Sequence, residues 1–159
     1  MKQLLRLAAL MSVMMAAVSC GKESGSGSAE IEVSYHNVSG TWVLERWSGG
    51  DLSDGLYLYM ELTRRDRRFT LYENMHTAYA HKTTGDYYIY VDESLGCSVI
   101  RGMYDYTHNY WSHRYIVSVT ENEMTWTATD DAGDVSVYRR CSGIPAEILA
   151  EAGDGGSAE

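Results

Sequence analysis

The feature that most constrains the fold is an alternation of apolar and polar residues with a period of two, repeated in short segments from about residue 40 onward. The segment LYLYMEL at 56–62 places leucines and a methionine on one face and tyrosines and a glutamate on the other. Such alternation is typical of antiparallel strands that cover a core with one face. The single proline, Pro145, lies beyond every such segment, so no proline interrupts the predicted sheet.

Eight segments carry this pattern, and glycine, aspartate, asparagine or charged residues typical of turns bound each of them. They are 41–47, 56–63, 67–73, 86–92, 97–104, 110–119, 123–130 and 134–141. An all-antiparallel sheet closes on itself with an even number of strands, and eight strands leave an interior that side chains nearly fill. We therefore predict an all-β fold, an eight-stranded antiparallel up-and-down barrel. The segment SGIPAEILAEAGDGG predicts a short C-terminal helix and then a disordered tail at 151–159.

The predicted connections differ in length at the two ends of the barrel. Three of the four links at one end are longer than any link at the other end, which predicts an elaborated mouth and a closed floor. The aromatic-rich stretch GMYDYTHNYWSHRY, residues 102–115, crosses that mouth in this arrangement. Its central residues 105–109 are expected to form a mouth loop.

Two short motifs resemble those of lipocalins. GTW at Gly40–Trp42 opens the first strand and resembles the G-x-W motif, and Thr129-Asp130 is similar to the start of the T-D-Y motif, with Asp131 where the family has tyrosine. The resemblance covers about residues 38–142 and is to the small lipocalin-like domains of Gram-negative bacterial lipoproteins. It implies a lipocalin-like barrel.

The resemblance also implies a structural pair at the floor. In lipocalins the tryptophan plugs the barrel floor, and an arginine from the last strand packs over it. Carried over to this sequence, the pair is Trp42 with Arg139, because Arg139 is in phase with Val135 and Val137, which we expect to point inward.

The N-terminal residues resemble the signal of a bacterial lipoprotein. Lys2 and Arg6 precede an apolar run that is too short to span a bilayer, and AVSC at Ala17–Cys20 resembles a lipobox. The resemblance implies a signal peptide at 1–19, a lipid on Cys20, and a location in the cell envelope, lipid-anchored to the outer membrane on its periplasmic or its surface face. Ordinary secretory cleavage nearby is the alternative. The Gly/Ser-rich residues 20–37 predict a flexible tether, followed by one barrel domain at 38–150.

The charge balance argues against nucleic acid as a partner. Removing residues 1–19 takes away two of the 13 basic residues and none of the 22 acidic ones, so the mature chain has 11 basic and 22 acidic residues and a net charge of −11. Such a chain repels phosphate backbones. The length suffices for one domain, and we expect a monomer.

Neither a metal site nor a catalytic motif is predicted. His76 and His81, like His108 and His113, lie five residues apart, which puts the paired rings on opposite faces of an extended segment, so solvated loop histidines are favoured over a metal centre. No G-x-S-x-G, phosphate-binding Gly-rich loop or CxxC occurs, and we expect a non-enzymatic protein without a cofactor.

Two cysteines remain after Cys20 is assigned to lipid. Cys97 begins one predicted strand and Cys141 ends another, both at the floor. A disulfide between them and two small buried thiols are both compatible with the sequence.

The leading functional hypothesis is a barrel that binds a small amphipathic or apolar molecule through its mouth. The candidate ligand-binding residues are Met60, Met103, Tyr104, Tyr106, His108, Trp111, His113, Tyr115 and Trp126. The alternative is a barrel filled by its own side chains that acts as a cell-surface glycan-binding or protein-interaction module. Its docking face would consist of outward tyrosines, namely Tyr57, Tyr59, Tyr88 and Tyr90.

Overall fold

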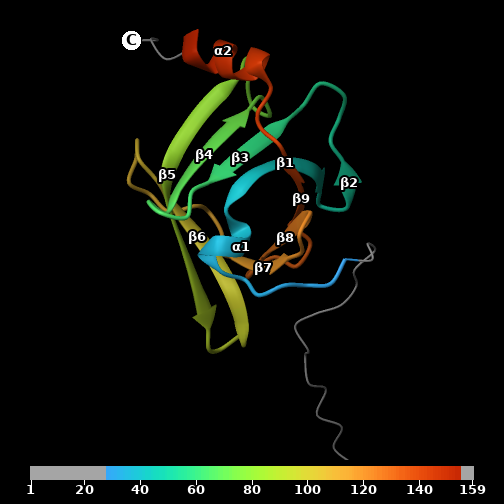
Figure 1. Cartoon of the computed structure of the whole chain (residues 1–159), viewed down its shortest axis with the longest axis vertical. Helices are drawn as coiled ribbons and strands as arrows, with labels where there is room; N and C mark the ends of the chain where they lie inside the picture. Colours follow the sequence, from blue (N-terminus) through green and yellow to red (C-terminus); the bar gives the residue numbers. More distant parts are fainter. Residues whose placement is uncertain (1–27, 155–159) are drawn as a thin grey trace, which may run out of the picture.

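The alternating segments form one antiparallel sheet that closes on itself in the computed structural model, which describes residues 28–154 (Figure 1). The strands are β1 (Gly40–Trp47), β2 (Gly50–Asp51), β3 (Leu58–Leu62), β4 (Arg68–Glu73), β5 (His81–Asp92), β6 (Cys97–Tyr104), β7 (Tyr115–Val119), β8 (Glu123–Ala128) and β9 (Val135–Cys141). Two helices, α1 (Tyr35–Val38) and α2 (Ala146–Asp154), flank them. The sheet order is β2-β1-β3-β4-β5-β6-β7-β8-β9, and β9 pairs back with β1. The predicted all-β eight-stranded barrel with a short C-terminal helix is confirmed, with β2 as an additional edge strand.

Two strands, β5 and β7, begin five residues away from their predicted starts because their backbones find other partners. β5 begins at His81, since His81 pairs directly with Glu73 of β4, and it runs on past the rest of the barrel in a long hairpin with β6 (Figure 1). β7 begins only at Tyr115, although a strand from residue 110 is predicted. The amide of Trp111 donates to the carbonyl of Gly102 at 2.8 Å, which holds residues before β7 at the mouth outside the regular ladder.

Aromatic side chains fill the barrel. Trp111 packs against Phe69 and Trp126 with ring centroids 5.1 and 5.3 Å apart, and Trp126 packs against Tyr138 at 4.9 Å. These four rings form an aromatic plug in the barrel interior. Gly102 makes room for the plug, because a Cβ at that position would lie 2.1 Å from the Trp111 ring. Because these rings occupy the barrel interior, space for a ligand is found at the mouth of the barrel and not at its centre.

The floor is closed by α1 and by an arginine of β9. Trp42 is fully buried, and its indole N–H donates to the carbonyl of Val38 at 2.8 Å. The guanidinium of Arg140 lies 4.1 Å from the centre of the Trp42 ring and donates to the carbonyls of Asn37 and Ser39, each at 2.8 Å. A tryptophan capped by a last-strand arginine is therefore present, but the arginine is Arg140.

The predicted partner Arg139 is wrong because the phase of the last strand is reversed. The inward residues of β9 are Ser136, Tyr138 and Arg140, while Arg139 is exposed and pairs with Glu45. Val135 and Val137 face outward and lie opposite threonines of β8.

The N-terminal boundary of the domain lies earlier than predicted. Ile31 forms an isolated bridge with Val119, and Ile31, Val33 and Tyr35 pack against the core, so residues 31–37 belong to the domain and not to a tether. The predicted signal peptide 1–19 and the lipidated Cys20 lie outside the described residues.

The C-terminal helix covers part of the outer wall. Ile148 and Ala152 of α2 form a second buried cluster with Tyr72 and Ala80, against which Tyr57 and Tyr59 pack. Because α2 continues to Asp154, the disordered tail predicted from residue 151 is wrong for 151–154. No helix between residues 28 and 154 is long and apolar enough to cross a membrane.

One possible cysteine bridge is ruled out. Cys141 is a free cysteine, so the bridge to Cys97 that the sequence leaves open is not formed.

Candidate functional site

Two adjoining hollows open at the mouth of the barrel. The outer hollow has a volume of about 390 Å³ and the inner hollow about 320 Å³, and Leu58, Leu71 and Tyr104 line both. The remaining outer lining is Glu73, Met75, His76, Thr77, His81, Thr83 and Tyr106. The remaining inner lining is Trp47, Trp111, Ser112, His113, Tyr115, Trp126, Asp134, Ser136 and Tyr138. Each volume is near the lower end of the range for small-molecule sites.

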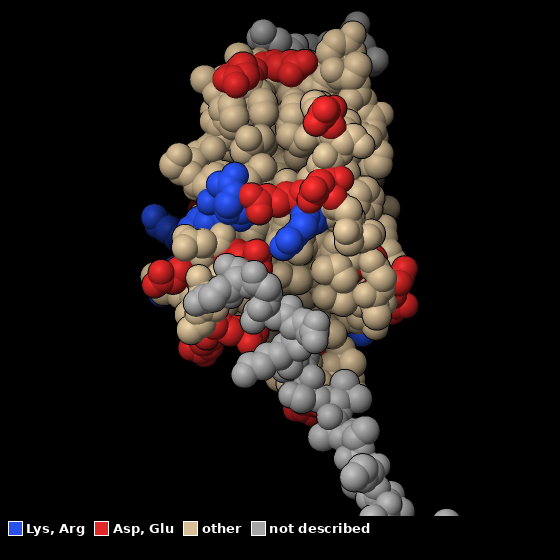
Figure 2. All heavy atoms as spheres, turned by 90° about the vertical axis from the view of Figure 1, so that its right-hand side faces the viewer, with Lys and Arg blue, Asp and Glu red and all other residues tan. Residues whose placement is uncertain are grey.

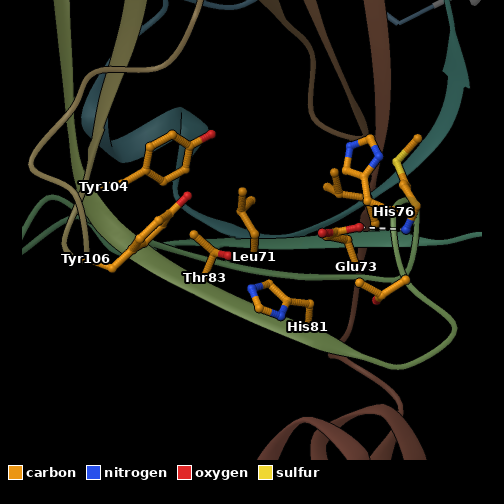
Figure 3. Close-up of a pocket in the computed structure, with 10 residues that line it drawn as sticks. Leu71, Glu73, His76, His81, Thr83, Tyr104 and Tyr106 are labelled. Atoms are coloured by element: carbon orange, nitrogen blue, oxygen red, sulfur yellow. Dashed lines mark hydrogen bonds between the residues drawn. The ribbon is translucent and has the colours of Figure 1, made fainter. Parts of the chain in front are cut away.

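The outer hollow places two phenols opposite a carboxylate. In Figure 3 the hydroxyl groups of Tyr104 and Tyr106 point into the space that Glu73 and His76 border on the far side. The Tyr104 and Tyr106 rings lie 5.5 Å apart, and the Glu73 carboxylate accepts the amide N–H of Met75 at 2.6 Å. The direct pairing of β4 with β5 puts Glu73 beside His81. The outer hollow therefore offers both apolar surface and hydrogen-bonding groups.

The inner hollow lies on the aromatic plug. Tyr115 stacks on Trp126 with centroids 5.6 Å apart, and burial, together with the nearby charge of Asp134, raises the pKa of Tyr115 to about 12. The indole N–H of Trp47, on the rim, donates to the Asp134 carboxylate at 2.8 Å. The negatively charged Asp134 carboxylate thus lies beside the aromatic rings that line the inner hollow.

Two polar groups in the plug have no partner. The indole nitrogens of Trp111 and Trp126 are buried without a hydrogen-bond acceptor among the described residues. A buried donor left unpaired costs about 1–3 kcal/mol, so the plug is not optimised for stability alone.

The hollows are lined by acidic side chains without lysine or arginine among residues 28–154. These acidic side chains are the carboxylates of Glu73 and Asp134. Within the same residues neither carboxylate forms an ion pair, whereas Asp105 pairs with Arg68 and Asp92 with Arg114. On the face shown in Figure 2, basic groups likewise lie beside acidic ones, while the acidic groups toward its upper end stand apart from any basic group in that view.

Six of the predicted binding residues line the hollows. They are Tyr104, Tyr106, Trp111, His113, Tyr115 and Trp126. Trp111 and Trp126 are almost completely buried, so they form the base of the inner hollow rather than its wall. His113 is held at the rim by a 2.8 Å contact with Asp130, and this contact lowers the pKa of the Asp130 carboxyl.

Three other predicted residues are not brought to the site. Met60 is fully buried in the core and contributes to neither hollow. Met103 pairs with Asp86 on the outer face, because Gly102 and Tyr104 take the inward positions of β6. His108 lies exposed in the mouth loop with a φ of 55°, beyond the lining of either hollow.

Sequence reasoning missed several lining residues for two reasons. The phase predicted for the last strand points the wrong residues inward, so the sequence does not predict the lining positions Asp134, Ser136 and Tyr138. Glu73 could not be predicted because its partner on β5, His81, lies outside the strand predicted at 86–92. The alternation of β3 does predict Leu58 as inward, and extending it across the β3–β4 register would have pointed to Leu71.

The histidines do not assemble a metal centre. In the part of the chain that the structure describes, no group of three or more histidine, cysteine, aspartate or glutamate side chains is arranged to hold a metal ion.

Comparison with known proteins yields no match among family models, curated proteins or solved structures. The site is therefore interpreted from its own geometry.

Proposed function

We propose that this protein is a lipid-anchored, lipocalin-like lipoprotein of the cell envelope that binds a small, partly apolar molecule at the barrel mouth. The observation that carries the proposal is the pair of joined hollows, which share Leu58, Leu71 and Tyr104. Concave sites of this size, with an apolar base and a few polar groups at the rim, are typical of small-molecule binding. The lipobox-like AVSC at Ala17–Cys20 supports the anchoring part of the proposal.

The proposed binding mode differs from a deep calyx. Since Trp111, Trp126 and Tyr138 fill the interior, the ligand would sit above them and leave the barrel core intact. The barrel is then a rigid support for a shallow mouth site. No catalytic step is assigned to it.

The test is native mass spectrometry of the full chain extracted from its own membrane in mild detergent. We expect a retained small-molecule mass in the native protein and its loss in Tyr104→Ala, because Tyr104 lines both hollows. Tyr79→Ala is the matched control, since Tyr79 is 73% exposed and lines neither hollow. Retention that is unchanged in Tyr104→Ala would contradict a mouth site.

A second candidate function rests on the filled interior. A barrel without a deep cavity is compatible with an interaction module, and Tyr88, Tyr90 and Val91 are exposed on the projecting part of β5. Tyr57 and Tyr59 are less suited to docking because they pack beneath the α2 cluster. Loss of glycan or partner binding in Tyr88→Ala, with Tyr104→Ala unaffected, would favour this function over the mouth site.

A further inference from the structure

We infer that the mouth site selects a positively charged ligand, an organic amine with an aromatic or similarly apolar body. The inference rests on the proposed function and adds the chemical class of the ligand. It is carried by the combination of unpaired carboxylates and aromatic rings in one concave surface.

The first step concerns charge. Glu73 in the outer hollow and Asp134 in the inner hollow are half-buried, and neither has a cationic partner within residues 28–154. The amide of Met75 donates a hydrogen bond to Glu73, and the indole of Trp47 donates one to Asp134. A carboxylate removed from part of its water gains more from an added cation than a fully exposed one does.

The second step concerns the pairing of charges elsewhere. Six other described carboxylates, at Glu45, Asp86, Asp92, Asp105, Glu123 and Asp130, have an arginine or a histidine within 4.0 Å. Other acids without such a partner are exposed, but among the half-buried carboxylates of residues 28–153 Asp86, Asp92 and Glu123 each have an arginine partner. Glu73 and Asp134, which line the hollows, are the half-buried carboxylates in that range that have none. An anionic ligand would meet repulsion from both, and a cationic ligand would complete the pairing.

The third step concerns the rings. Trp47, Tyr104 and Tyr106 border the hollows, and Trp47 and Tyr106 are 46% and 73% exposed, so their faces are available to a ligand. An ammonium group over a tryptophan or tyrosine face is attracted by the ring quadrupole, and the apolar body of an amine would rest on Leu58 and Leu71. Aromatic faces next to a carboxylate suit an amine better than a phosphate or a fatty acid.

The experiment uses three probes of similar size that differ in charge: phenethylamine, phenethyl alcohol and hydrocinnamate. Their dissociation constants are measured for the full chain in detergent by following tryptophan fluorescence. We expect the amine to bind about tenfold tighter than the alcohol, as a cation–π contact and a partly screened charge pair would give, and the carboxylate to bind most weakly. Asp134→Asn and Glu73→Gln should each weaken the amine several-fold and leave the alcohol unchanged.

Asp54→Asn is the matched control, because Asp54 is exposed and lines neither hollow. If the alcohol or the carboxylate binds as tightly as the amine, and Tyr104→Ala abolishes that binding, the charge inference fails while the mouth site stands. If none of the three probes binds, both the inference and the proposed mouth site are contradicted. A loss of amine binding in Asp54→Asn equal to that in Asp134→Asn would attribute the effect to net charge alone and overturn the inference.

Discussion

Arg140→Met should destabilise the protein far more than Arg139→Met, although the two arginines are adjacent in sequence. The guanidinium of Arg140 donates to the carbonyls of Asn37, Ser39 and Glu121, at 2.8, 2.8 and 2.7 Å, and caps the Trp42 ring. A hydrogen bond from a charged donor contributes about 1.5 kcal/mol or more, and the cation–π contact about 1 kcal/mol. Because Arg140 is partly exposed and these contributions are not additive, we expect a loss of about 3 kcal/mol rather than their full sum.

The assay is urea unfolding followed by tryptophan fluorescence. With a slope of about 1.5 kcal/mol per molar urea, a loss of about 3 kcal/mol lowers the midpoint by about 2 M. Arg139→Met removes only an exposed ion pair with Glu45, and its midpoint should move by less than about 0.4 M, which corresponds to about 0.5 kcal/mol. Methionine keeps the apolar stem in both variants, so the difference reports on the guanidinium. Equal losses, or a larger loss in Arg139→Met, would refute the assigned phase of β9.

Three further outcomes are expected. Gly102→Ala should lower the free energy of unfolding in urea by about 2–3 kcal/mol, because its Cβ would lie 2.1 Å from the Trp111 ring. Gly143→Ala, whose Cβ meets open space, should leave that free energy nearly unchanged. Similar losses in both variants would argue against the aromatic plug. Hydrogen bonds from Arg68 and Thr84 lower the pKa of the Asp105 carboxyl, so this group stabilises the fold above its usual pKa and loses that contribution as pH falls through its lowered pKa. The melting temperature of the native protein should accordingly fall more steeply below about pH 4 than that of Asp105→Asn, and parallel curves would count against the pairing. Ile148→Asp should speed hydrogen exchange in α2 and cost about 2 kcal/mol while the barrel stays folded, and the exposed neighbour Leu149→Asp should change neither; an equal effect of the two would contradict the docking of α2.

Strand count and closure were predictable because a period of two is repeated through most of the domain. The inward positions of β3 and β8 follow from their alternation, and Met60, Leu62, Met124 and Trp126 are indeed buried. The floor tryptophan Trp42 was also predictable from the GTW motif.

The phase of β9 could not be predicted from hydrophobicity. In VSVYRR the valines are the apolar residues, but the structure places them outside and puts Ser136 and Tyr138 inside. Tyrosine has a large apolar ring, and Tyr138 packs on Trp126, so the interior gains more contact from the tyrosine than it would from a valine. The pairing of β1 with β9 shifts register between Leu44 and Arg46 of β1. The sequence of β9 does not indicate this shift, so it could not be used to set the phase of β9.

Six of the candidate binding residues predicted from the sequence line the hollows, but several other lining residues could not be predicted. Tyr104 and Tyr106 were identifiable because aromatic residues cluster beside a predicted mouth loop. Glu73 and Asp134 were not identifiable, since their proximity to the rings depends on strand pairing across the barrel and not on local sequence.

The most direct test of the account is a two-dimensional proton–nitrogen NMR titration of the four indole N–H groups with phenethylamine. Trp47, Trp111 and Trp126 line the mouth, while Trp42 is sealed at the floor, so one spectrum contains its own control. We expect the three mouth signals to shift in a saturable manner and the Trp42 signal to stay in place. A saturable shift of Trp42 with the other three unchanged, or no shift in any of the four, would contradict a ligand site at the mouth of a filled barrel.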